Sequence, residues 1–179
     1  MALRDTSARR YAEAAFEIGR ADGTLDAWER DMATIGETMR HPELRRLLQH
    51  PAIPFSEKER VLRRVMRRGV AAGPINLVLL MVRRGRPGAI DGMIERFTAL
   101  LRRHRGIALA EVRTALPLDD GQRAELVSRL RTLTGSQVEV DETVDPDLIG
   151  GIAVRIGDQL YDATVRSRLE RLRARLTTV

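Results

Sequence analysis

The sequence has 179 residues, of which 43% are hydrophobic and 31% charged, a composition that excludes global disorder and fits one large domain or two small ones. It contains no cysteine, which excludes disulfides, thiolate metal sites and cysteine nucleophiles, and no apolar run reaches the ~20 residues that cross a bilayer. The net charge of +6 suits nucleic-acid binding, but residues 1–105 hold 21 basic and 13 acidic residues, whereas residues 106–179 hold 10 and 12.

Residues 1–105 show the periodicity of short helices separated by helix-breaking residues. The first helix carries an alanine-rich apolar stripe that starts at Ala8 and ends before Asp22-Gly23, because glycine readily takes the left-handed position after a helix. Thr24 is placed to cap the second helix, in which apolar residues repeat in steps of three and four. Pro42 suits the first turn of a short third helix.

Three further helices follow a proline-rich break. Ser56 and Glu59 have the spacing of a capping box and predict the start of the fourth helix. Gly73-Pro74 starts the fifth helix, and Pro87 starts a sixth that ends in a run of cations. Six short helices with short links predict a compact six-helix bundle as an N-terminal domain over residues 1–105.

The hydrophobic period changes after Gly106. Residues 107–116 alternate and predict a strand, Asp119 and Gln122 predict a capped helix, and Gly157-Asp158 predicts the turn of a hairpin. The last helix carries one apolar stripe, formed by Val165, Leu169, Leu172 and Leu176. The element order β-α-β-β-β-α predicts a small C-terminal α/β domain over residues 106–179.

Catalytic and metal-binding patterns are missing from the sequence. The three histidines do not pair at metal-ligand spacing, and no P-loop, GxSxG or HExxH pattern occurs. The acidic segment 141–147 is the best candidate for a cation site, but it lacks the glycine and terminal glutamate of a calcium loop, so a solvated acidic loop is favoured. Gly150-Gly151 is compatible with a phosphate-cradling or RNA-clamping loop, but a backbone kink or bulge is favoured. The sequence therefore predicts a protein that holds partners.

The run Ile75–Val82 is too continuously apolar for a helix with one solvent-facing side. Either this fifth helix is buried on all sides, or one face lies on the core and another forms a groove for a partner helix. Asn76 slightly favours the groove, because a buried amide needs a partner. The alanine-rich first helix permits close helix approach, so a groove shared by the first and fifth helices is possible.

Several motifs extend over nearly the whole chain in a fixed order. They are Ala8-Arg9-Arg10-Tyr11-Ala12-Glu13-Ala14-Ala15-Phe16, Pro51-x-Ile53 with Lys58, Asn76 with Leu79, Leu80, Arg83 and Gly85, Val112-x-Thr114-Ala115-x-Pro117-Leu118, Leu133-Thr134-Gly135, Asp145-Pro146-x-Leu148-Ile149-Gly150-Gly151, Ile156-Gly157-Asp158, and Asp162-x-Thr164 with Arg168-Leu169-x-x-Leu172. Each motif is weak alone, but in this joint order the sequence resembles the delta subunit of bacterial rotary ATP synthase, the oligomycin-sensitivity-conferring protein of mitochondria. Thr164 stands where serine is common in the family, and both residues are good helix caps.

The resemblance implies a non-catalytic stator subunit that couples ion-driven rotation to ATP synthesis. Its N-terminal bundle would bind the N-terminal helix of an alpha subunit, and its C-terminal domain would bind peripheral-stalk subunit b. Carried onto this sequence, the groove residues are Tyr11, Ala15, Ile18, Asn76, Leu79 and Val82. The resemblance implies no catalytic residue, cofactor, metal or nucleic-acid partner. It also implies that the protein is attached, through the complex, to the cytoplasmic face of the bacterial plasma membrane.

Two other functions remain as alternatives at this point. A basic RNA- or ribosome-binding protein is favoured by charge alone, but none of the six aromatic residues lies within the arginine clusters at 63–64, 67–68 and 83–86, where base stacking would need it. Thirty of the 31 basic residues are arginine, which indicates a genome-wide codon bias more than selected phosphate contacts. A small hydrolase is a distant third.

Overall fold

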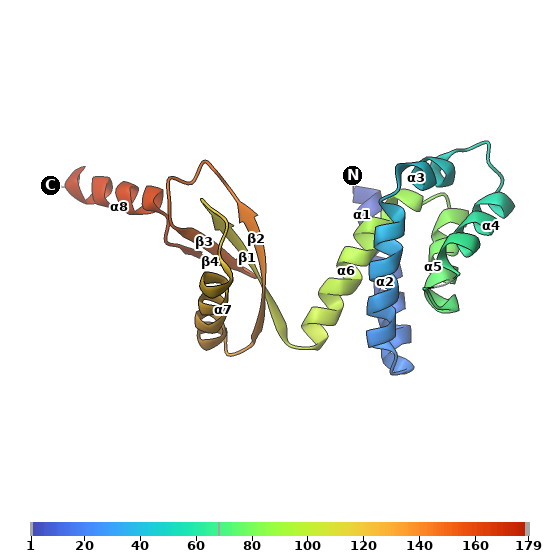
Figure 1. The fold of residues 1–179 in the computed structure, drawn as a ribbon, viewed down its shortest axis with the longest axis horizontal. Helices are drawn as coiled ribbons and strands as arrows, with labels where there is room; N and C mark the ends of the chain where they lie inside the picture. Colours follow the sequence, from blue (N-terminus) through green and yellow to red (C-terminus); the bar gives the residue numbers. More distant parts are fainter. Residues whose placement is uncertain (1, 68, 178–179) are drawn as a thin grey trace. The chain divides into compact units, whose positions relative to one another are not determined.

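The chain folds into two compact units in a computed structural model that describes residues 2–67 and 69–177. Unit 1 comprises Met1–Leu101 and unit 2 comprises Arg102–Val179 (Figure 1). Unit 1 is built from helices, and unit 2 combines a four-stranded sheet with helices. The predicted combination of a helical N-terminal part and a small C-terminal α/β part is confirmed.

Unit 1 contains helices in the six segments where the sequence predicts them. They are α1 (Ala2–Ala21), α2 (Leu25–Met39), α3 (Pro42–Gln49), α4 (Phe55–Met66), α5 (Ala72–Arg83) and α6 (Ile90–His104), with a short 3-10 turn η1 (Pro87–Ala89) before α6. The last residues of α6 belong to unit 2. Each helix turns its apolar stripe inward, and the side chains of Met32, Phe97 and Leu62 are at most 1% exposed. Burial of these stripes is the main stabilising term of unit 1.

The predicted cap of α4 is wrong. Proline at position 54 has extended backbone angles and precedes the helix, so α4 begins at Phe55, one residue before Ser56. Glu59 then lies inside the helix, where its carboxylate pairs with Arg63 at 2.8 Å. Thr24 does occupy the position before α2, but its side chain makes no capping bond, and its backbone carbonyl accepts bonds from Ala27 and Trp28 instead.

Unit 2 contains β1 (Ile107–Thr114), α7 (Asp120–Thr134), β2 (Gln137–Val144), β3 (Ile152–Ile156), β4 (Gln159–Asp162) and α8 (Val165–Thr177). The sheet order is β2-β1-β3-β4, in which β1 and β2 are parallel and the other two pairs are antiparallel. The predicted element order is confirmed, and so is the turn at Gly157, which joins β3 to β4 with a φ of +57°.

The acidic segment 141–147 differs from its prediction as a loop. Its first four residues extend β2, because they pair in register with β1 from Glu111 to Thr114. A parallel partner distant in sequence supplies backbone hydrogen bonds that the local sequence does not reveal. Strand β1 in turn ends at Thr114, two residues before the predicted end, where its carbonyl accepts a bond from Asp145.

One face of the sheet is covered by α7 and forms the small core of unit 2 (Figure 1). The alternating side chains of β1 place Val112 on this face, at 1% exposure, with Val154 beside it and Leu130 of α7 above. The opposite face carries Glu111 and Arg155, which lie directly across from each other on β1 and β3. Unit 2 therefore has one apolar and one charged sheet face.

Candidate partner-binding site

Helices α1 and α5 pack against each other in unit 1, as the possible shared groove requires. Ala12 and Ala15 of α1 are fully buried. The indole of Trp28 links the two helices at one end, since β-carbons added at Gly19 and Gly73 would lie 3.1 and 3.3 Å from its ring atoms. The C-terminal end of α1 therefore lies near the N-terminal end of α5.

At the other end of the helix pair the surface forms a hollow of about 700 Å³. Ser7 of α1, Val82 of α5 and Lys58 of α4 line this hollow. The ammonium of Lys58 donates to the backbone carbonyl of His50 at 2.8 Å, which fixes the proline-rich break against α4. Because the start of α1 meets the end of α5 here, the two helices run antiparallel.

The six predicted groove residues separate into two classes by accessibility. The accessible class consists of half-buried Tyr11, Ile18 at 49% exposure and exposed Asn76. The buried class consists of Ala15, Leu79 and Val82, at 0%, 5% and 6% exposure. The accessible side chains can contact a partner directly, whereas the buried ones support the surface from below.

Helix α5 is not buried on all sides. Leu80 is 43% exposed, and Asn76 and Arg83 lie on the same face of the helix as Leu80. Asn76 accepts a hydrogen bond from Arg63 at 3.3 Å, so it is an exposed amide and not the buried one that the sequence argument assumed. The sequence analysis missed the exposure of Leu80, because a continuous apolar run gives no periodicity from which to find the outer face.

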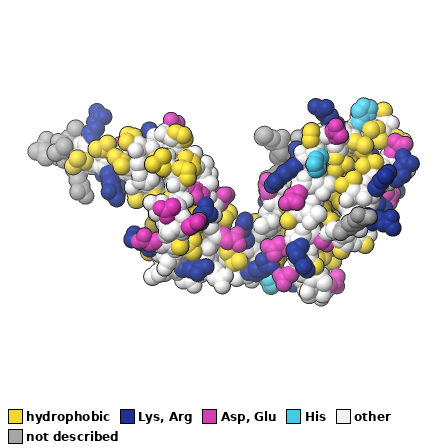
Figure 2. Space-filling model, viewed as in Figure 1, with side chains coloured by type: hydrophobic (Ala, Val, Ile, Leu, Met, Phe, Trp, Pro, Cys, Tyr) yellow, Lys and Arg dark blue, Asp and Glu magenta, His cyan; other side chains and the backbone are white. Residues whose placement is uncertain are grey.

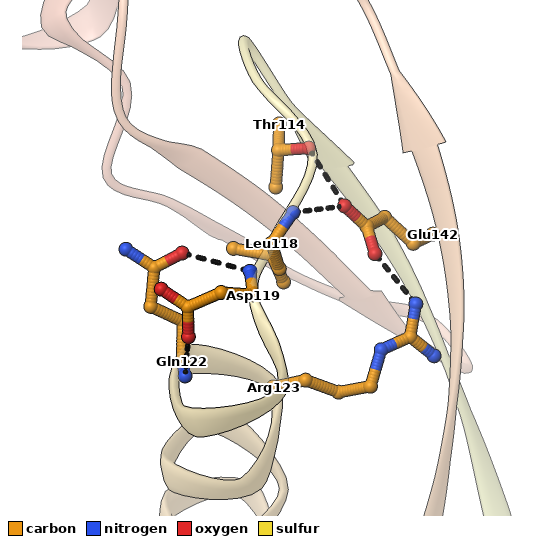
Figure 3. Close-up of polar contacts among 6 residues, drawn as sticks. All are labelled: Thr114, Leu118, Asp119, Gln122, Arg123 and Glu142. Atoms are coloured by element: carbon orange, nitrogen blue, oxygen red, sulfur yellow. Dashed lines mark hydrogen bonds and ion pairs between the residues drawn. The ribbon is translucent and has the colours of Figure 1, made fainter.

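In unit 2, Glu142 of β2 bonds to β1, to α7 and to the segment between them, on the α7 side of the sheet (Figure 3). Its carboxylate accepts bonds from the backbone N–H of Leu118 at 2.7 Å, from Arg123 at 2.6 Å and from Thr114 at 3.4 Å. The Leu118 N–H bond is the largest of the effects that lower the pKa of Glu142, and Arg123 adds to it. Glu142 thus fixes the segment that leads from β1 into α7.

That segment also contains the predicted capping box of α7, which is confirmed (Figure 3). The Asp119 carboxylate accepts from the backbone N–H of Gln122 at 2.7 Å, and the Gln122 side chain accepts from the N–H of Asp119 at 3.1 Å. Gly135 ends the helix in the left-handed conformation with a φ of +65°.

Next to this segment the surface has an apolar hollow of about 720 Å³. Leu116 and Ile149, which line it, are 76% and 70% exposed. The predicted kink at Gly150-Gly151 is confirmed in the same wall, where Gly151 has a φ of +86°. Apolar side chains this exposed are candidates for contact with another protein.

Two carboxylates of the acidic segment, those of Glu142 and Asp145, are engaged with protein groups. Asp145 pairs with Arg113 and accepts from the backbone N–H of Asp147 at 3.0 Å, and Arg113 is the main reason that the pKa of Asp145 is lowered. Within the part of the chain that the structure describes, no group of three or more acidic or histidine residues is placed to hold a metal ion. None of the described helices has the length and apolar character needed to cross a membrane.

Comparison with known proteins decides the family. Residues 8–176 match the model of the family described as ATP synthase delta (OSCP) subunit. The chain is 35% identical over 175 residues to ATP synthase subunit delta of Desulforamulus reducens, covering 97% of each protein. It is 36% identical over 164 residues to the subunit delta of Synechococcus elongatus, covering 90% of this chain and 91% of the other.

The chain belongs to the ATP synthase delta (OSCP) family. It also shares its fold with a chain of the Toxoplasma gondii mitochondrial ATP synthase hexamer, with a TM-score of 0.73 and 23% identity over 95% of this chain and 97% of that one. As a delta (OSCP) subunit it is a non-catalytic stator component of ATP synthase, in the peripheral stalk. The comparisons give no support to the RNA- or ribosome-binding alternative.

Proposed function

We propose that this subunit links the catalytic head of ATP synthase to the peripheral stalk through two separate surfaces. Unit 1, as a six-helix bundle over residues 1–105, holds the N-terminal helix of an alpha subunit. Unit 2, as a C-terminal domain over residues 106–179, holds the end of stalk subunit b. The main support is that the family match covers residues 8–176 and that these residues fold as two compact units. Each unit has exposed apolar side chains.

In unit 1 the alpha-subunit helix lies along the antiparallel pair α1 and α5. Tyr11, Ile18 and Asn76 make the direct contacts, because their side chains are accessible. The buried residues Ala15, Leu79 and Val82 lie beneath this contact surface. Because their side chains do not protrude, the partner helix can approach closely. Such an apolar contact depends weakly on salt, unlike nucleic-acid binding, which releases counterions.

The proposal places the subunit at the cytoplasmic face of the bacterial plasma membrane, attached through the complex. A part that resists rotor torque needs tight static contacts and no reaction chemistry of its own. The net charges of the two parts, +8 for residues 1–105 and −2 for residues 106–179, suit two different partners.

The proposal is tested at Ile18 in the full chain. Ile18→Asp places a charge in the groove, and burial of an unpaired carboxylate against an apolar helix should weaken binding of an alpha-subunit N-terminal peptide at least about tenfold. The binding constant is measured by calorimetry. Leu79→Asp is unsuited to this test, because Leu79 is 5% exposed and the charge would unfold the helix pair.

Val65→Asp is the matched control. Val65 is a β-branched residue of α4 at 53% exposure, close to the 49% of Ile18, but it lies on neither groove helix. Both variants should keep the helical content of the unchanged protein, and only Ile18→Asp should lose the peptide. Equal binding by the two variants would place the alpha-subunit contact elsewhere.

A further inference from the structure

Helix α8 exposes two leucines in the part of it whose side chains the structure describes. Leu169 and Leu172 are 55% and 54% exposed, although leucine is normally covered in a folded domain. Figure 2 shows hydrophobic side chains beside basic ones on the part of this helix that is drawn in colour. A stripe of this kind needs a covering partner.

The spacing of the stripe is that of a coiled-coil seam. Its apolar residues follow steps of four and three, which puts Leu169 at heptad position a and Val165 and Leu172 at position d. The same register puts three arginines at the flanking e and g positions, namely Arg166 and Arg173 at e and Arg168 at g. The flanking positions whose side chains the structure describes are therefore all positively charged.

The start of α8 is fixed to the body of unit 2, so the seam is presented in a defined place. The Thr164 hydroxyl accepts from the N–H of Ser167 at 3.2 Å, and Asp162 accepts from the N–H of Thr164 at 2.9 Å and from the Ser167 hydroxyl at 2.6 Å. Arg166 donates to the carbonyl of Asp147 at 3.1 Å, which leaves other guanidinium N–H groups for a partner.

We propose that α8 is one half of a two-helix coiled coil whose other half is a partner helix with apolar a and d positions and Asp or Glu at its e and g positions. Residues at e and g form interhelical ion pairs and choose the partner. A second copy of α8 would set arginine against arginine and is disfavoured. A membrane surface would need a wider apolar face than an a/d seam provides.

This inference rests on the proposed function, because it gives the chemistry of the stalk helix that unit 2 binds. A helix of 13 residues is short for a stable isolated helix, so covering the seam should also add to its stability. The partner is thus a helix with a heptad pattern and acidic residues beside its apolar seam.

The test uses the full chain and two designed heptad peptides with identical apolar seams. One peptide carries Glu at all e and g positions and the other carries Lys. Fluorescence anisotropy should show the Glu peptide binding at least about tenfold more tightly than the Lys peptide, because each flanking pair changes from attraction to repulsion. Equal binding of the two peptides would overturn the proposal.

Two variants of the same charge change separate the seam from the rest of the helix. Arg168→Glu acts at position g and should weaken binding of the Glu peptide, whereas Arg171→Glu acts at the outer position c and should leave it unchanged. The double variant Arg168→Glu with Arg173→Glu should bind the Lys peptide more tightly than the unchanged protein does. If Arg171→Glu weakens the Glu peptide as much as Arg168→Glu, general charge attraction explains the binding and the seam is wrong.

Three further outcomes distinguish a failure of the α8 seam from a failure of the proposed function. If the soluble part of subunit b binds the unchanged protein and the variants Arg168→Glu and Leu169→Asp equally well, the stalk contact stands and the α8 seam does not. If subunit b does not bind although the Glu peptide does, the seam stands and the proposed function fails. Binding to phosphatidylglycerol vesicles that Leu169→Asp abolishes, with no binding of the Glu peptide, would assign α8 to a lipid surface instead.

Discussion

Gly151 lies so close to Ala163 that a β-carbon at position 151 would stand 2.5 Å from the Ala163 carbonyl oxygen. The same β-carbon would stand 2.9 Å from the Cα of Thr164, the residue that caps α8. Both neighbours are backbone atoms, so neither can rotate away. Gly151 therefore allows the strand β3 to begin beside the segment that starts α8.

We expect Gly151→Ala to destabilise unit 2 by at least about 2 kcal/mol, from the clash and from a φ of +86° that alanine rarely adopts. Thermal unfolding followed by circular dichroism should show a midpoint lowered by roughly 10 °C. Gly157→Ala is the control, because Gly157 has a φ of +57° but open space around it. A Gly151→Ala midpoint no lower than that of Gly157→Ala would show that the close approach is relaxed in solution.

Asp162 gives a prediction for pH. Hydrogen bonds from the Ser167 hydroxyl and the Thr164 N–H lower its pKa from 3.8 to about 2. A carboxylate whose pKa is lower in the folded state stabilises the fold above the unfolded pKa, and this stabilisation is lost as the pH falls through the folded pKa. Asp162→Asn should therefore destabilise unit 2 at neutral pH, and the difference from the unchanged protein should disappear between about pH 4 and pH 2.

The pH prediction is checked by an NMR titration of the Asp162 carboxyl carbon together with acid unfolding of both proteins. A midpoint near 4 would mean that the bonds from Ser167 and Thr164 are not maintained in solution. It would also remove the Asp162 bonds from those that fix the start of α8, leaving the bonds of Thr164 and Arg166.

Trp28 gives a prediction for unit 1. Its side chain is 7% exposed and fits against Gly19 and Gly73, so Trp28→Ala should destabilise unit 1 by about 3–5 kcal/mol and loosen the pair α1 and α5. Chemical unfolding followed by circular dichroism measures the loss, with Val65→Ala as an exposed control. A loss close to that of the control would mean that the indole does not join the two helices.

The boundaries and types of most elements were predictable from the sequence, because amphipathic period, glycine and proline act locally. The cap of α7 was predictable for the same reason, whereas that of α4 was not, because Pro54 starts the helix before Ser56. The full length of β2 depends on its parallel pairing with β1, which no local pattern reveals. The outer face of α5 was also hidden, since Leu79 and Leu80 are equally apolar but only Leu79 is buried.

Residues 1–105 should fold without unit 2, because the core of unit 1 is formed by α1 to α6 alone. The fragment should unfold cooperatively, with Trp28 fluorescence and helical circular dichroism changing together, since this is the single tryptophan of the chain. Two separate transitions or a gradual change would show that unit 2 completes the bundle.

The central claim is that the subunit acts as a mechanical link, and the most direct measurement is ATP synthesis by membranes reconstituted with residues 1–105 in place of the full chain. We expect the fragment to bind the catalytic head but not to recruit subunit b, so that ion-driven ATP synthesis is lost while ATP hydrolysis by the released head persists. Hydrolysis persists because the subunit is non-catalytic. Normal ATP synthesis with the fragment would contradict the account, because unit 2 would then not be needed for the link.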